Sequence, residues 1–439
     1  MDWSQVLLLM LGLLCGLMAL GLPVAFAFLA VNCVGAWLFL GGEAGLMQLV
    51  RNSLAALANF SLVPIPLFLL MGEILFHTGV AYKAIEAVDR LINRVPGRLA
   101  VVAVAGGTVF SSLSGSTIAN TAVLGSSLLP DMLKRGYHPG LAMGPIMAVG
   151  GIAMLIPPSA LAVLLGSLAG ISIAKLLIAG ILPGILMSIL FVGYVMLRAK
   201  LNPALAPPDE PIQNASLGAR LMPFLIYVVP LFAIFIVVVG SIFLGLATPT
   251  ESAALGSLAA ALAAIAYGKG SCKAFAQALR ETAKIAVMIL FIIVASVTFA
   301  QILAFSGATD GLLRSIQAMQ LSPFLLLLAM LGILLLLGAF MDQVSMLMIT
   351  LPFYIPLANA LGLDLLWFGV LLLLVMEISF TTPPFGLLLY VMKGVAPPEI
   401  GMGQIYKAAL PFIVLEVIVL VLLIVIPELA TWLPTLIQR

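Results

Sequence analysis

The stretch LIPPS (155–159) interrupts a long apolar run, and the stretch TTPPFG (381–386) interrupts another. Each contains a proline pair, Pro157-Pro158 and Pro383-Pro384, and the pairs stand 226 residues apart in a chain of 439. Proline lacks a backbone N–H and clashes with the preceding turn, so it breaks or kinks a helix. The two stretches therefore predict broken helices at matching places in the two halves of the chain.

The composition places these helices in a lipid bilayer. Hydrophobic residues make up 63% of the chain, charged residues make up 8%, and the mean hydropathy is +1.27. Apolar stretches such as 221–247, 285–305 and 410–427 reach the ~20 residues that a helix needs to cross a membrane. Alternating strands of about ten residues are absent, which argues against an outer-membrane barrel. We predict an all-α polytopic membrane protein, and the net charge of +2 gives no reason to expect nucleic acid.

The offset between the proline pairs recurs elsewhere and indicates an internal repeat. The other matches are Pro130 with Pro356 and Gly136 with Gly362 at 226 residues, and Gly79 with Gly307 and Pro183 with Pro411 at 228. Residues 1–200 form the first half of the predicted repeat and 220–439 form the second. A polar linker, 201–219, joins them.

The distribution of positive charge indicates that the two halves have opposite orientations. The predicted span 61–79 is followed by four basic residues between 83 and 98, whereas the equivalent stretch 311–326 has only Arg314. Basic loops stay in the cytoplasm, so corresponding loops face opposite sides. The sequence predicts an inverted repeat with about five spans and one re-entrant hairpin in each half, an arrangement that several secondary transporters have.

The two hairpins are predicted over 99–133 and 324–356. Residues 99–133 contain two apolar pieces of about 15 residues, too short to cross a bilayer, and the polar residues Ser114–Thr117 join them. Basic residues flank both ends, so this segment should turn at Ser114–Thr117 and leave by the face where it started. Its counterpart should turn at Met341–Gln343, between flanks poor in Lys and Arg.

Ten spans complete the predicted topology, with both termini outside and 15 of the 19 Lys and Arg residues inside. The first apolar segment lacks a basic start and a cleavage site, so we expect it to be retained. Residues 41–60 and 268–284 are amphipathic and are predicted to lie along the membrane interface. The ten spans are predicted near 4–21, 22–40, 61–79, 140–168, 172–197, 221–243, 250–267, 285–305, 364–391 and 407–427.

Four interruptions of the apolar segments are the candidate site. Backbone that leaves helical geometry inside a membrane must be buried in protein or line a watery cavity, and the repeat would bring the four together near the midplane. Hydroxyls and freed carbonyls there suit a Na+ ion, and the helix N-termini that follow suit an anion. The predicted ion and substrate site comprises Ser114, Gly115, Ser116, Thr117, Asn120, Pro157, Pro158, Ser159, Asp342, Gln343, Thr381, Thr382, Pro383, Pro384 and Gly386.

A structural interpretation competes at each of these places. A proline pair alone often serves packing, and small residues often serve close helix contacts; their repetition at symmetric places favours a site. Asp342 is the strongest single residue, because a carboxylate at the tip of an apolar hairpin is costly unless it binds an ion or a proton. Glu377 could line the cavity or serve structure, and we expect Glu73, Glu251 and Glu416 to be structural.

The zone of the four interruptions contains no Lys or Arg. An anionic substrate would therefore be held by helix dipoles and bound cations, which favours co-transport of Na+. No Walker A, HExxH or GxSxG pattern occurs in a soluble segment, so we expect a transporter that is not an enzyme and does not hydrolyse ATP. Cys15, Cys33 and Cys272 lie far apart, and we expect neither a disulfide nor a cysteine metal site.

At these residues the chain resembles the large membrane subunit of tripartite ATP-independent periplasmic (TRAP) transporters. The resemblance extends over nearly the whole length, and its motifs are specific only in combination. They are SGSTIANTA at 114–122, PDMLKRGYHP at 130–139, IPPS at 156–159, ATPTESAA at 247–254, MDQ at 341–343 and TTPPFG at 381–386.

The resemblance implies an elevator-type carrier in a bacterial inner membrane, driven by a Na+ gradient. It also implies a small four-helix membrane subunit and a periplasmic binding protein that delivers an organic acid. Carried over by motif, it places Na+ at Ser114, Ser116, Asp342, Thr381 and Thr382. The family often has Val and Asn where this chain has Phe385 and Leu388, and a small polar residue where it has Val344, so the substrate is left open.

The leading hypothesis is the membrane subunit of a Na+-coupled carboxylate symporter, with the hairpins and broken helices moving against a scaffold of the other spans. A stand-alone Na+-coupled anion carrier, working without a binding protein, is the alternative among transporters. A membrane-embedded enzyme would need paired catalytic groups, for which only Asp342 and Glu377 are available. A channel would conduct far faster than a carrier turns over.

Overall fold

The computed structural model describes residues 1–92, 95–207 and 217–438, and within these ranges the chain is helical and contains no strand. The predicted all-α class is therefore confirmed. Arg94 and linker residues 208–216 lie outside the described residues. The helices before the linker are α1 (Trp3–Ala19), α2 (Val24–Phe39), α3 (Glu43–Leu57), α4 (Pro64–His77), α5 (Val80–Leu91), α6 (Arg98–Ser114), α7 (Thr117–Lys134), α8 (Pro139–Leu155), α9 (Ala160–Ala169), α10 (Ile173–Ala179) and α11 (Ile181–Leu201).

A short 3-10 helix, η2 (Pro203–Leu205), follows α11 and precedes the second half. Two other such turns are η1 (Phe60–Leu62) and η3 (Leu436–Gln438). The helices after the linker are α12 (Leu217–Tyr227), α13 (Val229–Phe243), α14 (Pro249–Ala266), α15 (Cys272–Phe305), α16 (Ala308–Ala318), α17 (Pro323–Gly338), α18 (Gln343–Ala360), α19 (Leu365–Thr381), α20 (Leu387–Val395), α21 (Met402–Val425) and α22 (Glu428–Thr435).

Eight helical segments among the described residues are long and apolar enough to cross a membrane. Seven of them fall within or across predicted spans, and the eighth is α18, an arm of the second predicted hairpin. The first two predicted spans correspond to α1 and α2, which are somewhat shorter. The chain is thus a polytopic membrane protein, while its sidedness stays a prediction.

The core is built around α8 and α19, the helices that precede the two proline pairs. Every residue of α8 from Leu141 to Leu155 is buried, and so is every residue of α19 from Trp367 to Thr381. A helix that is apolar on all sides is stable only when other elements surround it. Here α8 packs against α6, α7, α19 and α21, and α19 packs against α17 and α21, which puts both proline pairs at the centre.

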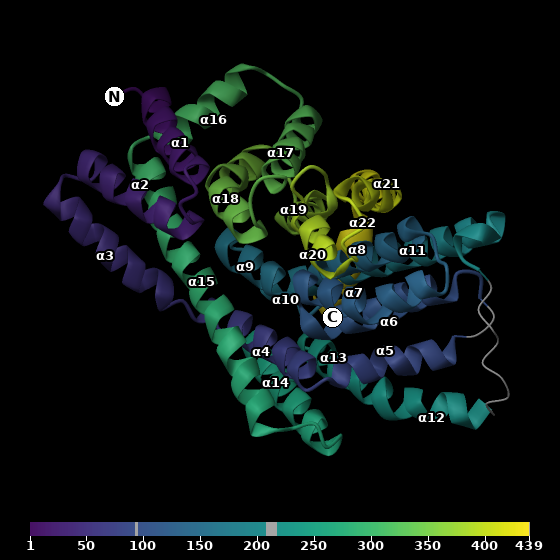
Figure 1. The fold of residues 1–439 in the computed structure, drawn as a ribbon. Coiled ribbons are helices and arrows are strands. Elements are labelled where there is room, and N and C mark those ends of the chain that lie inside the picture. Colours follow the sequence, from purple (N-terminus) through teal and green to yellow (C-terminus); the bar gives the residue numbers. More distant parts are fainter. Residues whose placement is uncertain (93–94, 208–216, 439) are drawn as a thin grey trace.

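A long outer helix, α15, runs beside this core and packs against α2, α3, α4 and α18 (Figure 1). It has 34 residues without interruption and so extends about 50 Å. The prediction of an interface helix over 268–284 followed by a separate span from 285 is therefore wrong. The polarity of the sequence changes near Lys284, but no Gly or Pro falls between Cys272 and Phe305 to break the backbone.

The positions that define the predicted repeat have matching local conformations. Gly79 and Gly307 both precede a helix at positive φ, 72° and 75°. Both proline pairs contain a cis peptide bond and follow a fully buried helix. The amphipathic helix α3 covers most of 41–60, as predicted, and rests on α2 and α15. The inversion of the repeat and the interfacial position of α3 stay predictions.

Candidate functional site

The first hairpin consists of α6 and α7, joined at Gly115 and Ser116. Gly115 has φ of +57°, a left-handed conformation that favours glycine. Ser116 begins α7 by accepting a hydrogen bond from Ala119 N–H at 3.3 Å. The turn between the two helices lies within 114–117, and the side chain of Ser114 lies outside the described part of the structure.

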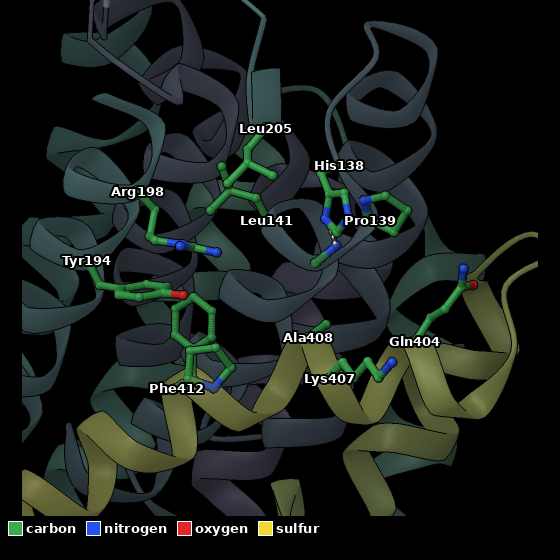
Figure 2. A pocket seen from close by; sticks show the side chains of 12 residues that line it. His138, Pro139, Leu141, Tyr194, Arg198, Leu205, Gln404, Lys407, Ala408 and Phe412 are labelled. Carbon is green, nitrogen blue, oxygen red and sulfur yellow. Dashed lines mark hydrogen bonds between the residues drawn. The ribbon is translucent and has the colours of Figure 1, made fainter. Parts of the chain in front are cut away.

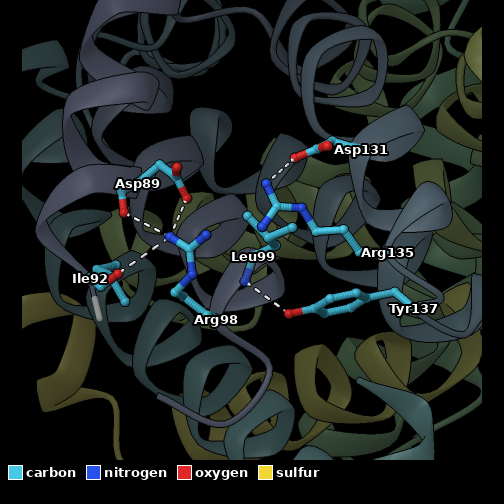
Figure 3. A network of polar contacts seen from close by, with 7 residues as sticks. All are labelled: Asp89, Ile92, Arg98, Leu99, Asp131, Arg135 and Tyr137. Atoms are coloured by element: carbon cyan, nitrogen blue, oxygen red, sulfur yellow. Dashed lines mark hydrogen bonds and ion pairs between the residues drawn. The ribbon is translucent and has the colours of Figure 1, made fainter. Parts of the chain in front are cut away.

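The two ends of this hairpin lie together (Figure 3). Arg98, at the start of α6, is 5% exposed and donates to a carboxylate oxygen of Asp89 at 2.7 Å and to its carbonyl at 3.0 Å. The next residue, Leu99, donates its N–H to the hydroxyl of Tyr137, just beyond α7, at 3.4 Å. The segment therefore returns to the place where it starts, which is the geometry that a re-entrant hairpin requires.

The tip of the first hairpin packs on the first proline break. Helix α8 ends at Leu155 and α9 begins at Ala160, and Ser159 caps α9 by accepting from Ala162 N–H at 3.2 Å. A Cβ atom built on Gly115 would come within 2.7 Å of the Pro158 carbonyl oxygen. This close approach is possible because residue 115 has no side chain.

The second hairpin consists of α17 and α18, and Asp342 caps α18. One carboxylate oxygen of Asp342 accepts from the N–H groups of Val344 at 3.0 Å and Ser345 at 3.1 Å, and the other accepts from the Ser345 hydroxyl. Gln343 already belongs to α18, so the turn covers 339–342. The arm continues to Ala360, beyond the predicted end at 356, because its two internal prolines do not end the helix.

The tip of the second hairpin packs on the second proline break. The rings of Phe340 and Phe385 have centroids 5.7 Å apart. Helix α19 includes Thr381, whose hydroxyl donates to the Ile378 carbonyl at 3.0 Å, and the Thr382 hydroxyl donates to the same carbonyl at 2.6 Å. The Thr382 hydroxyl proton is therefore directed to the backbone, which leaves its oxygen lone pairs as acceptors. The Thr381 hydroxyl also lies 3.3 Å from the Glu416 carboxylate, so its single proton has two acceptors within reach.

Contacts across the halves bring the two hairpin–break pairs together. The Gln343 side-chain amide, from the second hairpin, donates to the sulfur of Met154, just before the first break, at 3.0 Å. A Cβ on Gly151 of α8 would overlap the Glu377 carboxylate of α19, with only 1.2 Å between the atoms. All four predicted interruptions thus converge around the ends of α8 and α19.

Asn120 lies in the packing beside this centre. It is fully buried and donates to the carbonyls of Gly107 at 3.3 Å and Val149 at 3.2 Å, which ties α7 to α6 and α8. Its neighbour Thr121 has a buried hydroxyl oxygen without a partner among the described residues. Thr121 was not among the predicted site residues, although it belongs to the quoted motif 114–122.

The acidic residues divide into two groups. Glu251 caps α14 with Thr248, which is a structural role as expected, and a carboxylate oxygen of Glu73 lies 3.1 Å from Nε2 of His77 on the same helix. Glu377 and Glu416 are fully buried. Glu416 accepts from Thr381 at 3.3 Å, whereas neither carboxylate oxygen of Glu377 has a hydrogen-bond partner among the described residues.

Comparison with known proteins identifies the family. A family model described as the tripartite ATP-independent periplasmic transporter, DctM component, matches residues 11–429. The chain belongs to this family. It is similar to the C4-dicarboxylate TRAP transporter large permease of Pseudomonas aeruginosa, at 31% identity over 86% of each chain, and to the sialic acid permease of Vibrio cholerae, at 30% over 96% of each. The ectoine permease of Halomonas elongata is 29% identical over 98% of this chain and 99% of its own.

The TRAP permease also shares its fold with solved transporter structures. The YdaH transporter of Alcanivorax borkumensis superposes with a TM-score of 0.63 at 16% identity, over 90% of both chains. MtrF of Neisseria gonorrhoeae gives a TM-score of 0.58 at 15% identity, over 89% of this chain and 85% of its own. These two structures show a shared fold. The family model and the relatives show that the protein is the large permease subunit of a transporter for organic substrates, and these relatives are transporter permeases.

Proposed function

We propose that this TRAP permease couples the inward movement of Na+ to the import of an organic acid across a bacterial inner membrane. The observation that supports it most is the convergence of two hairpin tips and two broken helices around α8 and α19. Such interrupted helices present backbone N–H groups to anions and carbonyl oxygens to cations.

The charge of this region favours an anion bound together with a cation. Residues 114–117, 156–159, 339–343 and 381–386 contain no Lys or Arg, and Asp342 is their only acidic residue. A carboxylate substrate would be held by the N-termini of the helices that Ser116 and Ser159 cap, with Na+ offsetting its charge. The named relatives, for C4-dicarboxylates, sialic acid and ectoine, all handle molecules that carry a carboxylate.

The coupling ion would use oxygen ligands near the two hairpin tips. Asp342 is half-buried, and its carboxylate has lone pairs beyond those that cap α18. The Thr382 hydroxyl directs its proton to the backbone, and the Thr381 hydroxyl directs its proton to the backbone or to Glu416, so both oxygens keep lone pairs for a cation. Ser114 and Ser116 would complete the set from the first hairpin.

The proposed carrier works by an elevator movement and with two partners. The core around α8 and α19 would slide against the outer helices α4, α14 and α15, of which α4 packs on both of the others. A periplasmic binding protein would deliver the organic acid, and a small four-helix membrane subunit would support the outer helices, as the family's tripartite name suggests.

Uptake in proteoliposomes tests these proposals. The permease, the small subunit and the binding protein should together take up the organic acid only when a Na+ gradient is directed inward. An uptake rate that does not depend on the Na+ gradient would overturn Na+ coupling. Uptake by the permease alone would instead support the stand-alone carrier.

A further inference from the structure

A cavity with polar and apolar walls lies between the start of α8, the end of α11, η2 and α21, and none of the central-site residues lines it. Its volume is about 390 Å³. Figure 2 shows the side chains of Arg198 and Tyr194 at one side of it, His138 at another, and Lys407 and Gln404 on α21. The transport proposal uses none of these residues.

The polar groups of this cavity are arranged as hydrogen-bond donors. His138 accepts the Gly140 N–H at Nδ1, at 3.1 Å, which leaves Nε2 as the N–H donor. Gln404 accepts the Gly401 N–H at its carbonyl oxygen, at 3.3 Å, which leaves its NH₂ group free to donate. Arg198 and Lys407 add two positive charges, and the twelve described residues that line the cavity include no Asp or Glu.

The two cations of this cavity are exposed and, within the described part of the chain, are not neutralised by a nearby carboxylate. Arg198 and Lys407 have no ion-pair partner within 4.0 Å among the described residues, although the cations Arg98 and Arg135 of the same end of the molecule do pair with carboxylates. The N-terminus of α8, a helix of 17 residues, also lies at this cavity, and its dipole adds positive potential there. A phosphate group would satisfy both charges and the free donors at once.

The surroundings indicate that the anion belongs to a lipid. The remaining wall of the cavity is apolar and includes Leu141 and Phe412. On α11 and α21, large apolar side chains beside it are exposed: Leu197 by 56%, Leu410 by 58% and Val414 by 51%. In a membrane-spanning chain such residues face acyl chains. A cationic end next to an apolar wall matches a phospholipid, whereas a small soluble anion would leave the apolar wall unused.

We propose that this cavity binds the headgroup phosphate of an anionic phospholipid, with an acyl chain along α11 and α21. Basic pockets between membrane helices on the cytoplasmic side are known to take such headgroups. The predicted topology places Arg198 and Lys407 on that side. The proposal does not depend on Na+ coupling, and its test therefore uses no transport assay.

Native mass spectrometry of the purified permease, titrated with phosphatidylglycerol or phosphatidylcholine, tests this proposal. Phosphatidylglycerol should bind roughly tenfold more tightly, since two basic side chains contribute to headgroup attraction. The double variant Arg198→Gln, Lys407→Gln should lose this preference. The matched control Lys200→Gln, Lys269→Gln removes two exposed cations outside the cavity and should keep it.

Three results would overturn the proposal. The first is that the double variant at Arg198 and Lys407 prefers phosphatidylglycerol over phosphatidylcholine as strongly as the control variant does. The second is that the native chain shows no preference between the two lipids. The third is displacement of the lipid by inorganic phosphate at a concentration comparable with the lipid, which would assign the cavity to a soluble anion. Thermal unfolding of both double variants checks the fold, and Lys407→Glu, which should reverse the preference, provides a second variant at an exposed position.

Discussion

At the scale of the single residue, the carboxylate of Asp342 caps α18 and also stands at the tip of the second hairpin. An asparagine caps a helix about as well as an aspartate. Asp342→Asn should therefore change the free energy of unfolding by less than about 0.5 kcal/mol, while it removes the charge that we assign to Na+ binding.

We expect Asp342→Asn to raise the Na+ concentration for half-maximal uptake at least ~10-fold. The reason is that one charged ligand contributes at least ~1.4 kcal/mol of binding free energy, which is a tenfold change in affinity. Uptake as a function of Na+ measures it. Ser345→Ala is the control, since it removes the hydroxyl donor but keeps the carboxylate. An unchanged Na+ dependence in Asp342→Asn would remove this residue from the ion site.

A second residue-scale prediction concerns Gly151 and Glu377, which meet where α8 crosses α19. Gly151→Ala would place a methyl group on the Glu377 carboxylate, and such overpacking costs about 1–3 kcal/mol. Thermal unfolding in detergent should show this loss. Adding Glu377→Ala should restore most of it, because the methyl group then enters vacated space. A double variant no more stable than Gly151→Ala alone would contradict the packing described here.

At the scale of the element, the first hairpin depends on the bonds that hold its two ends. Arg98→Gln should cost about 1–3 kcal/mol, because it leaves the carboxylate and carbonyl of Asp89 without their buried donor. Arg90→Gln is the matched control: its ion pair with Glu86 is exposed and 3.7 Å long, so the change should be close to zero. Equal losses in the two variants would show that these bonds do not stabilise the hairpin.

The elements also show what the sequence could and could not predict. Two short apolar pieces around a Ser/Gly/Thr turn were enough to predict the first hairpin. The single helix α15 was not predicted, because a change from amphipathic to apolar sequence at Lys284 alters the surroundings of a helix and leaves its backbone unchanged. The second hairpin is predicted to end at 356, whereas α18 continues to Ala360, because membrane helices accommodate proline.

At the scale of the whole molecule, an elevator movement requires space between the core and the outer helices. A cavity of about 390 Å³ lies between α9, α15 and α18, lined by Ala300, Met348 and Pro352 among others. Beside this cavity a hydrogen bond joins α15 to α18: the Ser296 hydroxyl donates to the Met348 carbonyl at 2.9 Å.

Ala300→Trp should fill this cavity and slow uptake at least roughly tenfold, which corresponds to ~1.4 kcal/mol of added barrier. Its unfolding temperature should change little, because the side chain enters space that is already there. Leu258→Trp, at a residue 58% exposed on α14, is the control and should transport normally. Normal uptake by Ala300→Trp would argue that the core does not move against α15 there.

The sequence predicts that the four interruptions meet at the centre of the molecule, but it does not predict which side chains touch. The paired interruptions and the repeat predicted which segments meet. The sequence could not predict the partners, such as Gln343 with Met154 or Gly151 with Glu377, because these contacts join residues 189 and 226 positions apart on helices without polar patterning. A helix that is apolar on every side carries no signal of which face meets which neighbour.

The complete burial of α8 has a consequence for how the protein is made. Gly144 on this helix lies against Phe412 and the Ala408 carbonyl of α21. One side of α8 is therefore covered by α21, a helix that comes much later in the chain. Synthesis delivers α8 to the membrane more than half a chain before α21. Until then lipid or another protein must cover that side of α8, and the packing around α8 is complete only when α21 has been inserted.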